Sequence, residues 1–273
     1  MPPPLIMTPM TETKIKARLY TCENLKAGAT LTLGPDQAHY LMKVMRASNG
    51  EHVVLFNGRD GEWLSTVEGA SKKSCSLRIE EQLRAQAPEA DLWLAFAPLK
   101  KTSTDFVVEK ATELGISRLI PTFTERTNTT RVKTERLSLI AMEAAEQCDR
   151  LSVPDISQPV NFADLIAAWP KERILLVPDE TGSGPSLKTV LELKAENSEI
   201  SPHGFLIGPE GGFAPSELDA LAKLPFVKRV GLGPRILRAE TAALAALACF
   251  QAITGDWDQK PRFNNGYFFN ASR

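Results

Sequence analysis

From Leu92 to Ile253 the sequence alternates between short apolar runs and amphipathic stretches, a pattern that few architectures satisfy. The run Leu92–Ala97 is continuously apolar, as expected of a strand that is covered on both faces. Residues 134–149 carry apolar side chains at helical spacing and predict an amphipathic helix. Further strands are predicted at 118–123, 173–177, 204–207 and 227–232, and further helices at 104–114, 215–224 and 241–253. This alternation predicts an α/β domain with a mostly parallel sheet and helices on both faces.

The first part of the chain has a different pattern, because short half-buried strands follow one another with little helix between them. These strands are predicted at 15–20, 51–57, 62–68 and 74–80. Asn57-Gly58 and Asp60-Gly61 are turn dipeptides of the kind that joins hairpin strands. We therefore expect a small β-barrel-like module.

A single helix interrupts this module. Asp36 is placed to cap it, and its buried face is expected to hold Leu41, Val44 and Met45. The polar segment 82–90 has no periodic face and contains a proline, so it marks a domain boundary. We divide the chain into a flexible leader (1–13), the barrel-like module (14–84), the α/β domain (85–255) and a tail (256–273).

Composition excludes several classes of protein. The 273 residues are 43% apolar and 24% charged, which argues against a disordered, collagen-like or coiled-coil chain. The formal net charge of −1 offers no global positive field to a nucleic acid, so any basic surface must be local. The four cysteines are far apart and lack ligand spacing, so we expect neither a disulfide framework nor a metal site. No basic segment opens the chain and no apolar run reaches the ~20 residues of a membrane span, so we expect a cytoplasmic protein without membrane contact.

Three glycine-containing loops follow predicted strands late in the α/β domain. One begins Pro178-Asp179-Glu180, the second reads Gly208-Pro209-Glu210-Gly211-Gly212-Phe213, and the third spans 231–241. In an open α/β sheet, ligands bind outside the carboxyl ends of the strands. Glycine lets the backbone approach a ligand, so exposed amides and carbonyls there can read an adenine edge or hold a carboxylate. The same residues also suit an ordinary tight turn, and both interpretations stay open at this point.

Familiar nucleotide and hydrolase signatures are absent from the sequence. No Gly-x-Gly-x-x-Gly opens a helix after a strand, and there is neither a Gly-x-x-x-x-Gly-Lys-Ser/Thr phosphate loop nor a Gly-x-Ser-x-Gly elbow. His39, His52 and His203 show no catalytic spacing to a cysteine or aspartate, so we expect each to be structural or solvated. The absence of these signatures argues against a dinucleotide-dependent enzyme, an ATP-binding protein or a hydrolase.

The second and third loops together carry a specific pair of motifs. Ile207-Gly208-Pro209-Glu210-Gly211-Gly212-Phe213, followed by Leu232-Gly233-Pro234-Arg235-Ile236-Leu237-Arg238-Ala239-Glu240-Thr241-Ala242, resembles the RsmE-type small-subunit ribosomal RNA uridine N3-methyltransferases of the SPOUT class. Earlier segments also resemble this family, at residues 39–41, 44–46, 55–59, 110–115, 124–126 and 143–147. The resemblance therefore covers about residues 15–255. The family often has an Arg-Trp pair where this chain reads Glu135-Arg136-Leu137, so no role is assigned to that tryptophan.

The resemblance implies a fold, a cofactor and an assembly. The first module would be a PUA-like RNA-binding β-barrel, and the second domain a SPOUT α/β-knot whose last segment threads a trefoil. The loops of the knot would hold S-adenosyl-L-methionine in a bent shape, without a metal, at the interface of a homodimer. The implied cofactor-binding residues lie in the three late loops: Val177, Pro178, Gly208, Pro209, Glu210, Gly211, Gly212, Leu232, Gly233, Ile236, Leu237, Arg238 and Thr241.

The implied reaction is methylation of N3 of a uridine in small-subunit (16S) ribosomal RNA. Uracil N3 carries a hydrogen, so the enzyme must favour the N3 anion and align it with the methyl donor. Arg238 is the candidate for the electrostatic role, because its charge is permanent. Glu210 or Glu240 would take the proton or orient the loop, although Glu240 also suits the first turn of a helix. The candidates for RNA contact are arginines, which suit phosphates and stacked bases: Arg18, Arg46, Arg59, Arg126 and Arg150.

Other functions stay open from the sequence. A catalytically silent RNA-binding or ribosome-assembly factor would share this architecture. An enzyme that methylates transfer RNA or a protein would share the cofactor loops as well. A dehydrogenase is the weakest alternative, because its dinucleotide fingerprint is lacking.

Overall fold

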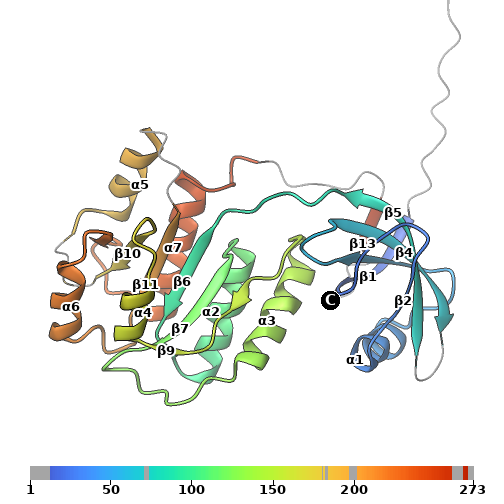
Figure 1. Ribbon diagram of the computed structural model, residues 1–273, viewed down its shortest axis with the longest axis horizontal. Coiled ribbons are helices and arrows are strands. Elements are labelled where there is room, and N and C mark those ends of the chain that lie inside the picture. Colours follow the sequence, from blue (N-terminus) through green and yellow to red (C-terminus); the bar gives the residue numbers. More distant parts are fainter. Residues whose placement is uncertain are drawn as a thin grey trace, which may run out of the picture. The chain divides into compact units, whose positions relative to one another are not determined.

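The computed structural model describes residues 13–70, 74–179, 181, 184–196, 202–259 and 267–269. The chain divides into two compact units, an N-terminal unit of residues 1–87 and 261–273 and a C-terminal unit of residues 88–260 (Figure 1). The division falls inside the polar segment 82–90. The predicted leader lies outside the described residues except for Thr13, which begins the first strand.

The N-terminal unit is built on one six-stranded sheet with the order β13-β1-β3-β4-β5-β2. The strands are β1 (Thr13–Tyr20), β2 (Thr30–Thr32), β3 (His52–Phe56), β4 (Glu62–Ala70), β5 (Cys75–Arg84) and β13 (Tyr267–Phe269). β3, β4 and β5 pair antiparallel, whereas β1 runs parallel to β3. Apolar side chains such as Leu19, Leu55 and Leu77 form the core on one face of this sheet. The strands predicted between 15 and 80 are thus present.

The helical segment of this unit differs from the prediction. A short helix, α1 (Pro35–His39), continues directly into a π-helical turn, η1 (Tyr40–Val44). Gly34, and not Asp36, occupies the N-cap position. The wider π-turn shifts the side chains that follow Leu41 around the axis, so Leu41 is fully buried while Val44 is 61% exposed.

The predicted tail contains one further strand. Tyr267–Phe269 forms β13, which pairs in parallel with Thr13–Ile15 at the outer edge of β1. β1 offers this segment a free edge with which to pair. The segment assigned as a tail therefore contributes a strand to the N-terminal sheet at these residues.

The C-terminal unit contains the predicted parallel sheet. Its strands are β6 (Leu92–Phe96), β7 (Arg118–Phe123), β8 (Asp155–Ile156), β9 (Val160–Asn161), β10 (Ile174–Pro178), β11 (His203–Ile207) and β12 (Val227–Val230). They follow the order β12-β10-β11-β6-β7-β8, with β9 on β7, and every pairing is parallel. The sequence predicted the five longer strands and missed the two-residue strands β8 and β9.

Helices cover both faces of this sheet (Figure 1). They are α2 (Lys101–Glu113), α3 (Thr134–Gln147), α4 (Phe162–Ala168), α5 (Leu187–Glu196), α6 (Pro215–Ala222) and α7 (Ala239–Ile253). Buried residues of α2, α3, α5 and α7 pack on one face, and those of α4 and α6 on the other. No helix among the described residues is both long enough and apolar enough to cross a bilayer.

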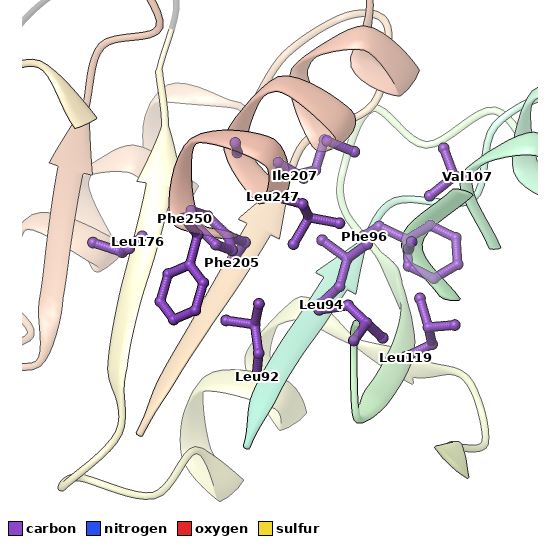
Figure 2. Packing of buried hydrophobic residues seen from close by; sticks show 14 of the residues in the cluster. Leu92, Leu94, Phe96, Val107, Leu119, Leu176, Phe205, Ile207, Leu247 and Phe250 are labelled. Atoms are coloured by element: carbon purple, nitrogen blue, oxygen red, sulfur yellow. The ribbon is translucent and has the colours of Figure 1, made fainter. Parts of the chain in front are cut away.

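β6 shows how the sequence specifies these two layers. Leu92, Leu94 and Phe96 point into the core under α2 and α7, while Ala95 points into the opposite core. Figure 2 shows the first three beside Phe205 of β11 and Leu247 of α7. Both faces of the strand are buried, which explains its unbroken apolar sequence.

Candidate active site

The carboxyl ends of β10, β11 and β12 lie together at one edge of the parallel sheet. Pro178 is in register with Val230, and Leu176 is in register with Phe205, so the three strands end at about the same level. The three loops singled out from the sequence start here. Because these strands are direct neighbours in the sheet, the loops form one continuous edge.

The loop after β11 is a compact turn. The Gly212 N–H donates to the Pro209 carbonyl at 2.9 Å, and Gly212 has a φ of +66°, which favours glycine. Gly208 lies against the ring of buried Phe213, since a Cβ at that position would come within 3.1 Å of it. Phe213 thus anchors the loop to the core and leaves Glu210 and Gly211 exposed.

The loop after β12 presents its backbone. Between Leu232 and Arg238, no N–H group donates to another protein group among the described residues. Gly233 has a φ of +97° with open space around it, and Ile236 is 84% exposed. Arg238 occupies the N-cap position of α7 with an exposed side chain.

The loop after β10 is joined tightly to β12. Asp179 accepts hydrogen bonds from the Arg229 guanidinium and from the Thr181 hydroxyl. Its own N–H donates to the Val230 carbonyl at 3.0 Å. Further along, the Gly231 N–H donates to the Pro185 carbonyl at 2.9 Å. The last residues of β12 are therefore held by backbone on both sides.

A fourth loop, after β7, adjoins the loop after β11. The buried Glu217 side chain on α6 accepts from the Glu125 N–H at 2.9 Å and from the Ala214 N–H at 2.8 Å. Arg126 donates to the Gly211 carbonyl at 2.9 Å. Sequence reasoning missed Glu217; the available signal was the helix-start pattern of a proline followed two residues later by glutamate.

The predicted catalytic residues all lie at this edge. Glu210 is exposed in the loop after β11, while Arg238 and Glu240 lie at the start of α7. None of the three side chains has a hydrogen bond or ion pair among the residues that the structure describes. Thr241, one of the cofactor candidates, is exposed on the first turn of α7.

Two of the predicted RNA-contacting arginines have internal roles instead. Arg18 is buried over the Phe56 ring, and its Nε donates to Glu62 at 2.6 Å. Burial raises the pKa of Glu62, but hydrogen bonds and charge from Arg84 and Arg18 outweigh it and leave that pKa below its ordinary value. Arg150 pairs with Glu89 and donates to two backbone carbonyls. Both guanidinium groups are occupied within their own unit, so the structure does not support these two predictions.

The other three arginines are exposed. Arg46 follows η1 with a φ of +52°, a left-handed conformation that is uncommon outside glycine. Arg59 lies at the tip of a turn and donates to the Cys22 carbonyl at 2.9 Å. Arg126 belongs to the loop after β7 described above.

The residues at this edge fit the cofactor that the sequence resemblance implies. The N–H groups of the loop after β12 have no partner in the described part of the chain and can bind the acceptor atoms of an adenine or a carboxylate. Half-buried Leu232 and Leu237 supply apolar surface, and Gly233 leaves room for a ligand to approach the backbone.

Comparison with known protein families agrees with this architecture. Residues 86–251 match the model of an RNA methyltransferase domain, and residues 33–80 match that of an RNA methyltransferase PUA domain. The chain is 33% identical over 232 residues to the ribosomal RNA small subunit methyltransferase E of Rickettsia conorii, covering 85% of this chain and 93% of that protein. The chain therefore belongs to the RNA methyltransferase family that includes these E-type enzymes.

Solved structures of similar sequence share the fold. One is a ribosomal RNA small subunit methyltransferase E from Neisseria gonorrhoeae bound to S-adenosyl methionine, with a TM-score of 0.78, 26% identity and coverage of 88% of this chain and 99% of that one. Another is a methyltransferase from Legionella pneumophila in complex with the same cofactor, with a TM-score of 0.76, 28% identity and coverage of 86% and 97%. The SPOUT and PUA assignments of the two units are confirmed.

Proposed function

We propose that this protein uses S-adenosyl-L-methionine to methylate N3 of a uridine in small-subunit ribosomal RNA. The observation that carries the proposal is the position of the two motif loops. They leave β11 and β12 at one edge of the sheet, both contain glycines, and the N–H groups of the loop after β12 have no partner among the described residues. A chain of this family with two such loops at the edge of its parallel sheet has the groups that binding a methyl donor requires.

The cofactor, when bound, supplies an electrophilic methyl group on a sulfonium. In the proposed site, residues of the three loops hold it: Val177, Pro178, Gly208, Pro209, Glu210, Gly211, Gly212, Leu232, Gly233, Ile236, Leu237, Arg238 and Thr241. Their task is to bind and orient, and most of the contacts would come from the backbone.

The charged residues at the edge serve the nucleophile. Arg238 is placed to stabilise the N3 anion through the flanking uracil carbonyl oxygens, because its exposed guanidinium has no partner among the described residues. Glu210 or Glu240 accepts the N3 proton.

Arg46, Arg59 and Arg126 are the proposed RNA contacts. Arg126 lies beside Gly211, next to the proposed cofactor loop, and the other two belong to the PUA unit. Exposed arginines bind phosphates through paired N–H groups and stack on unpaired bases. Because N3 is buried in a base pair, the target uridine must be unpaired or turned out of its stack.

We also propose that the three loops form a trefoil knot. Residues 230–231 run between Asp179 on one side and Pro185 on the other, with backbone hydrogen bonds to both. A knot requires a later segment of the chain to pass through an earlier loop. The end of β12, which lies between two parts of the loop after β10, is the segment that we propose to pass through it. A homodimer that completes the site, and a cytoplasmic location beside the ribosome, are further parts of the proposal.

Transfer of labelled methyl groups tests the proposed reaction. The protein is incubated with labelled S-adenosyl-L-methionine and with either free small-subunit RNA or small subunits that lack the modification. We expect incorporation, and nucleoside mass spectrometry should identify N3-methyluridine. RNA binding without incorporation would support a silent assembly factor instead. Incorporation only into transfer RNA or protein would assign a different acceptor.

A further inference from the structure

Glu217 connects two loops of the proposed active site, although it lies outside both. We propose that Glu217 is a positioning residue that holds the loop after β11 in the conformation that binds the cofactor. This inference rests on the proposed function and adds a residue to it. It follows from where the two carboxylate oxygens are used.

The two oxygens serve different parts of the chain. One accepts the Ala214 N–H at 2.8 Å, and the other accepts the Glu125 N–H at 2.9 Å, from a residue 92 positions away in sequence. The Glu217 side chain is buried, with only 6% of the residue exposed, so water competes little for these bonds. Hydrogen bonds from backbone N–H groups to a carboxylate are among the stronger ones in proteins.

Helix capping explains only half of this arrangement. A glutamate at the third helical position normally reaches back to the N-cap N–H, as Glu217 does to Ala214. That role uses one oxygen and would leave the side chain at the surface. The second oxygen is committed to the loop after β7, which capping does not require.

The effect of this contact passes directly into the proposed cofactor loop. Ala214 follows Phe213, whose ring lies against Gly208, so fixing Ala214 also fixes the base of that loop. Two exposed hydrogen bonds join the same loops: Ser216 donates to the Glu125 carboxylate at 3.1 Å, and Arg126 donates to the Gly211 carbonyl. Glu217 is the buried member of this set, so it is the one that water cannot replace.

The substitution Glu217→Gln tests the proposal with little change in shape. An amide has one oxygen and one NH₂ group. Its oxygen can accept a hydrogen bond from only one of the two backbone N–H groups, and its NH₂ group then faces the other N–H, where no hydrogen bond can form. Loss of one hydrogen bond to a charged group predicts amide exchange faster by about tenfold to a hundredfold at Glu125 or Ala214 in the cofactor-free protein. We expect the dissociation constant of S-adenosylhomocysteine to rise about tenfold.

The kinetic signature separates positioning from general damage. A loop that is loose before binding raises the KM for the methyl donor, while saturating donor restores the loop and leaves kcat within about threefold. Asp219→Asn is the matched control, because it removes one exposed carboxylate from the same helix and should change neither value. Glu217→Asp keeps the charge but is one methylene shorter, so it should lose one contact and behave like Glu217→Gln.

Thermal unfolding of each variant shows that binding is measured on folded protein, and Glu217→Asp replaces Glu217→Gln if the latter does not fold. Unchanged S-adenosylhomocysteine affinity in a folded variant whose Glu125 or Ala214 amide exchanges faster would overturn the positioning role alone. An equal loss of affinity in Asp219→Asn would do the same, because it would point to charge and not to contact. If the unsubstituted protein does not bind S-adenosylhomocysteine, the proposed function fails, and the positioning role with it.

Discussion

Arg46 offers a test in which stability and RNA binding should change in opposite directions. Its φ of +52° places it in the left-handed region directly after η1. The Ala47 N–H donates back to the Leu41 carbonyl at 3.0 Å and closes the end of the π-turn, with Arg46 in the left-handed conformation that glycine usually adopts at helix ends. The side chain is exposed and makes no hydrogen bond or ion pair among the described residues. The left-handed backbone of Arg46 therefore lowers the free energy of unfolding, and no side-chain contact among the described residues compensates for it.

The magnitude follows from two opposing effects. A left-handed non-glycine residue costs about 1–2 kcal/mol, and Arg46→Gly removes that strain. Glycine in turn makes the unfolded chain more flexible, which costs about 0.5–1 kcal/mol. The net gain should be about 0.5–1 kcal/mol, or roughly 2–8 °C in the Tm of a unit of this size.

RNA binding should weaken in the same variant. Loss of one arginine–phosphate contact should reduce affinity about tenfold and lower the slope of log affinity against log salt by roughly 0.7–0.9. Arg46→Ala is the matched control, because it removes the same side chain but keeps a Cβ in the left-handed conformation. It should lose RNA affinity equally without the gain in Tm. Lys26→Ala removes a different exposed cation of the same unit and should leave the Tm unchanged.

Calorimetry and a salt-dependent RNA titration of these variants decide the matter. Arg46→Gly with unchanged RNA affinity and salt slope would refute the assignment of Arg46 as a contact. A lower Tm for Arg46→Gly than for Arg46→Ala would refute the strain argument.

Four further predictions concern the rest of the molecule. Gly212→Trp should abolish S-adenosylhomocysteine binding in a titration, because the position has a φ of +66°, whereas Arg238→Ala should slow turnover about 10²-fold with affinity within threefold. Glu62→Gln should destabilise the N-terminal unit by about 3 kcal/mol near neutral pH, since buried Arg18 loses its partner. The folded pKa of Glu62 lies below its unfolded value of about 4.5, so the stability that the ionised Glu62 contributes is complete above pH 4.5 and is lost as the pH falls through the folded pKa. Urea unfolding across pH 2–7 should show this loss of stability in the parent protein and in the control Glu23→Gln, but not in Glu62→Gln. Gly184→Ala should lower the free energy of unfolding by about 1–3 kcal/mol in urea, because its Cβ would lie 2.1 Å from a carbonyl oxygen of β12.

The sequence predicted most of the C-terminal unit because its pattern there is strong. β7 was predicted at 118–123 and is found at Arg118–Phe123, and α3 begins at Thr134 as expected. Predictions failed where a local irregularity changes the period. The π-turn exposes Val44, which was expected on the buried face of its helix.

The loops of the proposed site were located from the sequence, but the contacts that support them were not. Motif order located the loops after β11 and β12, because glycine and proline mark loops in the sequence itself. The buried partners of these loops come from distant segments, as Glu125 and Glu217 do, and no periodicity relates them. Arg18 illustrates the same limit, because its burial depends on Glu62, which is 44 positions away. Contacts of this kind follow from strand order, which a single sequence does not contain.

Backbone hydrogen bonds support the edge of the proposed active site together with side chains, which explains how glycine-rich loops can be rigid enough for catalysis. The Gly231 N–H donates to the Pro185 carbonyl and the Asp179 N–H donates to the Val230 carbonyl, so backbone hydrogen bonds hold the end of β12 in addition to the Arg229–Asp179 ion pair. Gly184 lets its loop come so close to Arg229 that no Cβ would fit. Glycines that would be flexible in an open loop are thereby confined between neighbouring strands. The close approach of neighbouring chain segments thus restricts backbone that glycine would otherwise leave flexible. Two carboxylates add to this, because Glu217 joins the loop after β7 to α6 and Asp179 joins the loop after β10 to β12.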